Sequence, residues 1–208
     1  MINPKDFIDT LCSLGVDFCT GVPDSLLKNL TQVIENEGIK GNLKHIISAN
    51  EGTAFSTASG YYLGTEKIPL VYLQNSGLGN IVNPVLSLSH REVYSIPIFI
   101  IIGWRGEPRL KDEPQHIVQG SKTCELLTAL DIKFQILDNK VNNYKAQLVD
   151  LFSESKKNSS PVALLVRKNS FLDSNLKNYN THHFNLSLKR EEAIKIILSR
   201  DSIHKVYF

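Results

Sequence analysis

The segment 96–102, which reads Ile-Pro-Ile-Phe-Ile-Ile-Ile, constrains the fold more than any other part of this chain. A strand that is apolar at almost every position must be covered on both faces, which is typical of parallel sheets between two layers of helices. Other short runs with strand character cover residues 16–22, 44–49, 69–74, 133–137 and 162–166. Helical spacing of apolar residues falls between most of them, over residues 6–14, 26–34, 52–63, 81–88 and 141–152. This alternation predicts an α/β protein with a doubly wound, mainly parallel six-stranded sheet and helices on both faces.

Polar residues follow four of the predicted strands at the point where each strand ends. They cover residues 23–25, 50–51, 75–80 and 104–116, the last of which is predicted to be a loop. In doubly wound sheets, ligands bind beyond the carboxyl ends of the strands, and these ends meet at one edge. We therefore expect the four segments to lie together and to form the binding site.

The composition argues against several other classes of protein. The formal net charge is +2, so no strong attraction to nucleic acid or to a membrane surface is expected. The sequence has no apolar run of about 18 residues and no apolar signal-peptide region at its N-terminus. Three cysteines at unrelated spacings favour reduced thiols and a cytoplasmic protein.

Three common site motifs are incomplete in this chain. Gly77-Leu78-Gly79 lacks the third glycine of a dinucleotide-binding turn, because Val82 stands at that position. The remaining interpretations of this segment are a turn that caps a helix and a loop whose backbone lies against a ligand. Ser76 lacks the flanking glycines of a hydrolase nucleophile elbow. His182-His183 stands in a polar stretch without a third metal ligand.

Each candidate site residue has a purely structural alternative. Glu51, at a strand-to-helix switch, could meet a ligand or only stabilise the helix N-terminus. Asp24 and Ser25 could simply cap the helix that follows them. His116 could be a surface histidine or a group that transfers protons near neutral pH. Arg105 and the other basic residues of its loop could counter an anionic substrate or be solvated.

Four motifs occur in chain order, each after a predicted strand. They read Gly21-Val22-Pro23-Asp24-Ser25-Leu26-Leu27, Asn50-Glu51-Gly52-Thr53-Ala54, Asn75-Ser76-Gly77-Leu78-Gly79-Asn80 and Asp112-Glu113-Pro114-Gln115-His116. Over residues 1–170 they resemble the thiamine-diphosphate-dependent decarboxylases, in particular their N-terminal pyrimidine-binding domain. The resemblance implies a carboxy-lyase of phosphonate biosynthesis that converts phosphonopyruvate to phosphonoacetaldehyde and carbon dioxide, with sulfopyruvate as the alternative substrate.

The same resemblance implies roles for individual residues. Glu51 matches the glutamate that hydrogen-bonds the pyrimidine ring nitrogen of the cofactor, and because this acid must keep its proton near neutral pH, we expect it to be buried. The implied cofactor contacts are Glu51, Asn75, Ser76, Gly77, Gly79 and Asn80. The residues expected to be catalytic are Glu51, His116, Ser25 and Asp24, and those expected to contact the substrate are Ser25, Gln115, His116 and Arg105. Among these, His116 is the best candidate for the proton relay.

The family also requires a second domain, which holds Mg²⁺ and the diphosphate through a Gly-Asp-Gly motif. This chain contains no Gly-Asp dipeptide. We therefore expect a pyrimidine-binding domain over 1–170, a linker over 171–188 and the start of a further domain over 189–208, as in a truncated longer protein. The diphosphate-binding domain would be supplied in cis or in trans, and the isolated chain would be inactive. The assembly would be a homo-oligomer, and its small substrate would be a 2-oxo acid anion. The competing hypotheses are a natural α subunit of a sulfopyruvate-cleaving enzyme and a non-catalytic α/β module that binds a partner or a small anion.

Overall fold

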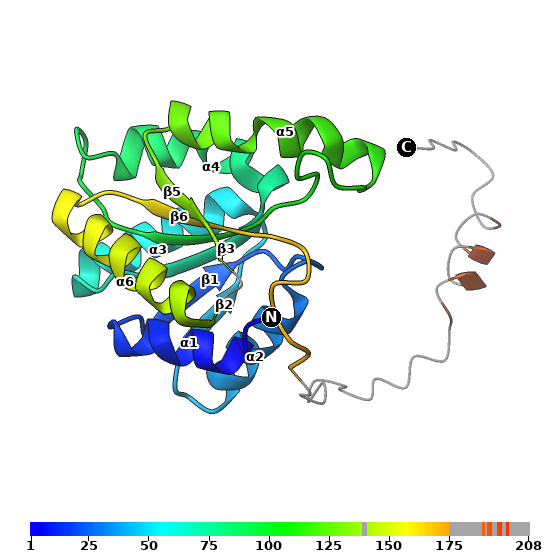
Figure 1. Cartoon of the computed structure of the whole chain (residues 1–208), viewed down its shortest axis with the longest axis horizontal. Coiled ribbons are helices and arrows are strands. Elements are labelled where there is room, and N and C mark those ends of the chain that lie inside the picture. The colour runs from blue at the N-terminus through cyan, green and yellow to red at the C-terminus, as the bar shows by residue number, and fades with distance from the viewer. Residues whose placement is uncertain (139–140, 175–188, 190, 193–194, 197–198, 200–208) are drawn as a thin grey trace. The chain divides into compact units, whose positions relative to one another are not determined.

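The computed structural model describes residues 1–138, 141–174, 189, 191–192, 195–196 and 199 (Figure 1). One compact unit spans Met1–Leu176. Residues 175–188 and most of the segment 189–208, which is predicted to begin a further domain, lie outside the described residues. The description below therefore concerns the first unit.

Six parallel strands form one sheet, in the order β2-β1-β3-β4-β6-β5. The strands are β1 (Phe18–Gly21), β2 (Lys44–Ile47), β3 (Leu70–Gln74), β4 (Phe99–Gly103), β5 (Lys133–Ile136) and β6 (Val162–Val166). β4 is buried at all five positions, as its sequence predicts for a strand covered on both faces. The predicted number of strands and the doubly wound arrangement are confirmed.

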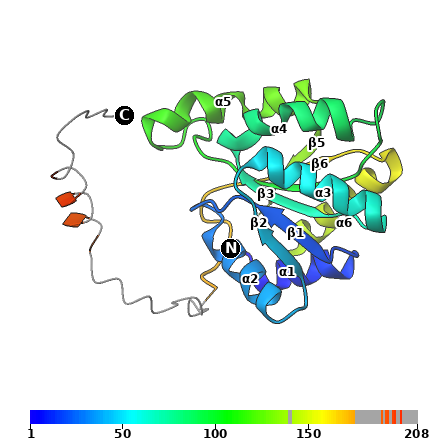
Figure 2. The same cartoon turned by 180° about the vertical axis from the view of Figure 1, so that it is seen from behind.

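Helices cover both faces of this sheet (Figures 1 and 2). They are α1 (Pro4–Ser13), α2 (Lys28–Ile39), α3 (Glu51–Thr65), α4 (Leu78–Pro84), α5 (Pro114–Ala129) and α6 (Val141–Asn158), with a 3₁₀ turn at Asn75–Gly77 and a π-helical turn at Val85–Ser89. One apolar cluster joins α1, α2 and α6 to the sheet through Phe7, Leu30 and Leu148. The other joins α3, α4 and α5 to the opposite face through Phe55, Ile81 and Leu127.

Helix α5 is the main departure from the elements predicted by the sequence. A polar loop is predicted over 104–116, but the helix already begins at Pro114, a residue suited to the first helical turn. Its buried positions are Gly120, Thr123 and Leu127. Only one of the three is strongly apolar, so the helical period is weak in the sequence although the helix is long.

The connections after β1 and β3 define where a ligand can enter. The two strands are neighbours, yet β1 leads to α2 on one face and β3 leads to α4 on the other. Such a switch point opens a crevice beyond the carboxyl ends of the two strands. None of the described helices is both long enough and apolar enough to cross a membrane.

Candidate active site

The four polar segments predicted from the sequence meet at the carboxyl edge of the sheet. Arg105 Nη1, after β4, donates to Ser25 Oγ, after β1, over 3.2 Å. The Arg105 backbone also exchanges hydrogen bonds with Asn75, which follows β3. Asn80 Nδ2, in the same β3 segment, donates to Glu51 Oε2, after β2, over 2.7 Å. The expectation that these segments lie together is thus confirmed.

Glu51 is the first residue of α3, and its carboxylate lies against the turn after β3. A Cβ on Gly77 would collide with this carboxylate, and a Cβ on Gly52 would lie 2.8 Å from the Asn80 carbonyl oxygen. Glycine is therefore needed at both positions for α3 and α4 to approach so closely. The helix N-terminus is already capped by Asn50, whose side chain accepts from Thr53 N–H.

The expectation that Glu51 is buried is wrong for the chain as described. Its side chain is half-buried, because it stands at the rim where α3, the β3 turn and solvent meet. Oε2 accepts from Asn80, while no described residue donates to Oε1. The acid is thus held in place with one oxygen open to a ligand.

Asp24 is the buried carboxyl group of this edge, only 6% exposed. Neither carboxylate oxygen has a hydrogen-bond partner among the described residues. Burial raises the pKa of Asp24, an effect opposed by the nearby amides of Leu26 and Leu27 and by the charge of Arg105. A Cβ on Gly103 would collide with Asp24 Oδ2, so the end of β4 is shaped around this group.

Neither Asp24 nor Ser25 is the N-cap residue of α2, although the amides of Leu26 and Leu27 lie close to the Asp24 carboxylate. Helix α2 begins at Lys28, and its N-cap residue, Leu27, makes no side-chain cap. Ser25 Oγ instead accepts the hydrogen bond from Arg105. The exposed Ser25 side chain is therefore available to the site at the β1 end, whereas the Asp24 carboxylate is buried.

Arg105, Asp112 and His116 form one polar cluster beside Ser25. Arg105 pairs with both oxygens of Asp112, over 3.1 Å from Nε and 2.7 Å from Nη2. This pairing holds the pKa of Asp112 well below its usual range and raises the pKa of Arg105. His116 Nδ1 lies 3.1 Å from Asp112 Oδ1, in the first turn of α5 rather than in the loop that the sequence predicts. Asp112 therefore orients both the arginine and the histidine.

Asn75 has its side chain fully buried and turned towards the protein. Its Nδ2 donates to the Arg105 carbonyl over 2.8 Å and to Thr123 Oγ1 over 2.9 Å, and its Oδ1 accepts from Arg105 N–H. Gln119 Nε2 completes this contact by donating to the Asn75 carbonyl over 2.9 Å. Asn75 thus holds the β3 turn against α5 and the β4 loop.

Sequence reasoning missed residues of α5 and of the loop before it that support the site. Asp112, Gln119 and Thr123 were not among the predicted site residues, yet each contacts a residue that was. Their spacing, with His116 between them, follows one face of a helix and was the available signal. Gln115, which was predicted to contact the substrate, is exposed, and its side chain makes no hydrogen bond to another described residue.

The remaining predicted cofactor contacts line the turn after β3. Ser76 is exposed and its hydroxyl accepts from Gln74 Nε2 over 2.8 Å. Gly79 and Asn80 are exposed at the start of α4, where their backbone is accessible. The described residues contain no group of three histidine, cysteine, aspartate or glutamate side chains that could hold a metal ion.

Comparisons with known proteins agree with this fold. A family model described as "Thiamine pyrophosphate enzyme, N-terminal TPP binding domain" matches residues 4–126. A solved structure from Mycobacterium smegmatis, assigned to the thiamin diphosphate-dependent enzymes, superposes with a TM-score of 0.61 at 17% identity. The match covers 85% of this chain and 33% of that one, and it supports the fold alone.

Curated relatives share more of the sequence. Phosphonopyruvate decarboxylase of Streptomyces viridochromogenes is 38% identical over 138 residues, which are 66% of this chain and 33% of that protein. Sulfopyruvate decarboxylase subunit alpha of Methanococcus maripaludis is 36% identical over 153 residues, which are 73% of this chain and 86% of that subunit. The chain thus spans about a third of the length of the phosphonopyruvate decarboxylases that it matches.

Proposed function

Because this chain belongs to the thiamine pyrophosphate enzymes, as their N-terminal cofactor-binding domain, we propose that it forms the pyrimidine-binding half of a 2-oxo acid decarboxylase. The proposed reaction converts phosphonopyruvate to phosphonoacetaldehyde and carbon dioxide. Sulfopyruvate is the second candidate substrate, since relatives of both names match at similar identity. The family and the four ordered motifs support the cofactor, thiamine diphosphate.

The position of Glu51 carries the proposal. A carboxyl group stands at the first residue of α3, packed against Gly77 and held by Asn80, with Oε1 open. In the proposed complex this group hydrogen-bonds the pyrimidine ring nitrogen, and the ligand completes the burial that the chain alone does not provide. Gly77 and Gly79 allow the backbone of the β3 turn to lie close to the ring.

The substrate side of the site is proposed at the β1 and β4 ends. Ser25 and Arg105 orient the substrate anion, and Asp112 keeps the Arg105 guanidinium in place through two hydrogen bonds. Asp24, whose pKa is raised by burial, is the buried acid of this edge, and His116 moves protons between solvent and the reacting centre. When bound, the cofactor supplies an electron sink for decarboxylation.

The diphosphate end of the cofactor needs groups from elsewhere. Since no metal-binding cluster forms among the described residues, we assign Mg²⁺ and the diphosphate to a separate domain, supplied in cis or in trans. In this proposal residues 1–170 are the pyrimidine-binding domain, residues beyond them connect to or begin another domain, and the active enzyme is a cytoplasmic homo-oligomer.

The test combines this chain with a diphosphate-binding domain, thiamine diphosphate and Mg²⁺, and measures carbon dioxide release from phosphonopyruvate. Glu51→Gln is expected to abolish most of the activity. Glu66→Gln is the matched control, because Glu66 is exposed at the other end of α3, about 22 Å away. Full activity of Glu51→Gln would contradict the proposed role.

A non-catalytic binding module predicts a different outcome. In that case the assembled protein would show no calorimetric binding of thiamine diphosphate with Mg²⁺ present, and no carbon dioxide release from any 2-oxo acid. Binding that is lost in Glu51→Gln but kept in Glu66→Gln favours the decarboxylase.

A further inference from the structure

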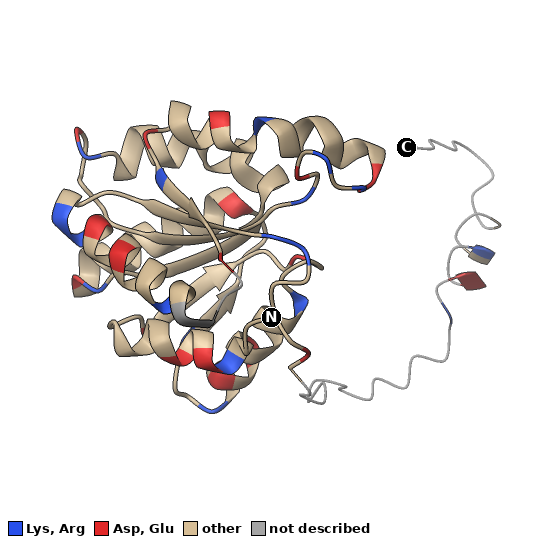
Figure 3. Ribbon diagram, in the orientation of Figure 1, with Lys and Arg blue, Asp and Glu red and all other residues tan. Residues whose placement is uncertain are grey.

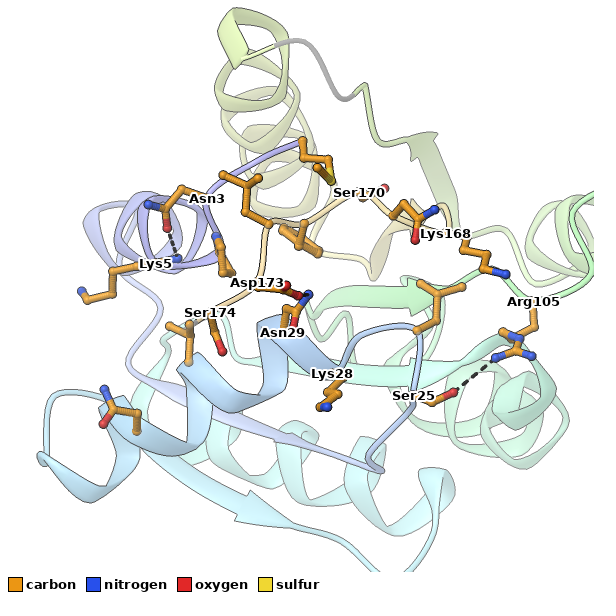
Figure 4. A pocket seen from close by; sticks show the side chains of 18 of the residues that line it. Asn3, Lys5, Ser25, Lys28, Asn29, Arg105, Lys168, Ser170, Asp173 and Ser174 are labelled. Carbon is orange, nitrogen blue, oxygen red and sulfur yellow. Dashed lines mark hydrogen bonds between the residues drawn. The ribbon is translucent and has the colours of Figure 1, made fainter. Parts of the chain in front are cut away.

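A large cavity opens beside the Ser25–Arg105 hydrogen bond, on the side of the site away from Glu51. Its volume is about 950 Å³, and it lies between α2 and the segment that follows β6 (Figure 4). Residues 170–174 form one wall, where Asp173 accepts from Asn29 and Ser174 donates to Gln32 of α2. The segment after β6 thus packs along α2.

The lining of this cavity is cationic. Five lining side chains are basic, and two are carboxylates: Lys5, Lys28, Lys40, Arg105, Lys168, Asp112 and Asp173. Lys5 and Lys40 pair with Glu37 at one end of the cavity. Lys28 and Lys168 have no ion pair with any described residue. Figure 3 shows the corresponding basic segments at the start of α2 and in the loops after β4 and β6.

Lys168 and Arg105 are neighbours by the register of the sheet. Gly103 pairs with Val166, and Trp104 N–H donates to the Val166 carbonyl over 2.8 Å, so the strands run side by side into their loops. Two residues further on, Arg105 and Lys168 both line the cavity. Figure 4 shows them at the same end, next to Ser25.

Lys28 lines the same cavity from a third element. It is the first residue of α2, whose N-terminus has no side-chain cap and carries partial positive charge. Hydrogen bonds to Asp112 and Ser25 use three of the five N–H donors of the Arg105 side chain, which leaves two for a ligand. The Ser25 hydroxyl accepts from Arg105, so its own proton can be donated onward.

We propose that Lys28 and Lys168, with Arg105 and Ser25, form a subsite for the tetrahedral oxyanion of the substrate. This inference rests on the proposed decarboxylase function and adds its specificity-determining residues. A phosphonate or a sulfonate is separated from the reacting 2-oxo carbon by one methylene group, so its binding groups must adjoin the site. Arginine and flexible lysine donors that line one cavity from separate elements suit an oxyanion with three exposed oxygens. The small 2-oxo acid would occupy only the part of the cavity next to Ser25 and Arg105.

The experiment compares kcat/KM for phosphonopyruvate, sulfopyruvate and pyruvate, using the chain assembled with its diphosphate-binding domain. Lys28→Gln and Lys168→Gln are each expected to lower kcat/KM for the two oxyanion substrates roughly 10-fold, and the double variant roughly 100-fold. The value for pyruvate, which lacks the oxyanion, should change by less than about 2-fold. Lys156→Gln is the control, since this exposed lysine at the end of α6 is remote from the cavity lining. A larger loss for phosphonopyruvate than for sulfopyruvate would assign the subsite to the dianion.

Equal losses for all three acids, or no loss for any, would overturn the subsite. If the unaltered assembly cleaves none of the three acids, the proposed function fails, and a direct titration then decides the subsite. In that titration the full chain is mixed with methylphosphonate or methanesulfonate and followed by amide NMR shifts. Shifts around Ser25 and Lys168 that disappear in the double variant support the subsite, and their absence from the unaltered chain refutes it.

Discussion

The Asp24 carboxylate lowers the free energy of unfolding at neutral pH, and Asp24→Asn should raise it. The carboxyl group is 6% exposed, and neither oxygen has a hydrogen-bond partner among the described residues. Burial raises its pKa above that of the unfolded chain, so the native state binds the proton more tightly. The free energy of unfolding therefore falls as the pH rises from about 4 through the raised pKa, and it stays lower above that range.

The size of the effect follows from the burial of an unsatisfied group. An unpaired buried polar group costs about 1–3 kcal/mol, and the charged form lies at the upper end of that range. The charge of Arg105 offsets part of this cost. We expect Asp24→Asn to raise the free energy of unfolding by about 1–2 kcal/mol at pH 8, which corresponds to about 2–4 °C in Tm for each kcal/mol.

Urea and thermal unfolding at about pH 8 and about pH 4, followed by circular dichroism, measure this difference. The gain should be present at the higher pH and smaller at the lower one, where Asp24 is mostly protonated in the native state and about half protonated in the unfolded chain. Asp150→Asn, on the exposed face of α6, should change stability by less than about 0.5 kcal/mol at either pH. A gain that does not depend on pH, or a loss at the higher pH, would refute the reasoning.

Three further substitutions test the site framework. Gly77→Ala places a methyl group against the Glu51 carboxylate and should lower stability by about 1–3 kcal/mol and weaken cofactor binding, measured by unfolding and by calorimetry. Asn75→Ala removes the hydrogen bonds to the Arg105 backbone and should lower the free energy of urea unfolding by about 2–4 kcal/mol, more than an exposed asparagine does. Asp112→Asn should lower the free energy of unfolding by about 1–3 kcal/mol at pH 7. The effect should become smaller as the pH falls below about 4, because the Asp112 carboxylate, whose pKa is lowered in the native state, stabilises that state only while it is ionised.

The layers of the fold are predictable because they depend on local patterns. An apolar run such as 96–102 can only be a strand covered on both faces, and polar clusters after four strands predict a common edge. These patterns place Glu51, Ser25 and Arg105 at one edge before any contact is known. The structure adds the hydrogen bonds that join them.

Features that depend on long-range packing could not be predicted in the same way. The identity of the buried acid is one of them: Asp24 is buried by the end of β4 at Gly103, whereas Glu51 stays at a rim. Helix α5 has a buried face of Gly120, Thr123 and Leu127, which carries too little apolar signal. The cavity needs residues 168–174 to return over α2, a contact between distant parts of the sequence.

The central claim is that Glu51 contacts the pyrimidine ring of thiamine diphosphate. Nitrogen NMR tests this contact directly. The cofactor is labelled at its pyrimidine ring nitrogens and bound to the chain, which is assembled with its diphosphate-binding domain. The account predicts one ring nitrogen with a hydrogen-bonded or protonated shift in the unaltered protein and in Glu66→Gln, and a shift close to that of the free cofactor in Glu51→Ala, which has no side-chain donor. The same shift in all three proteins would contradict it.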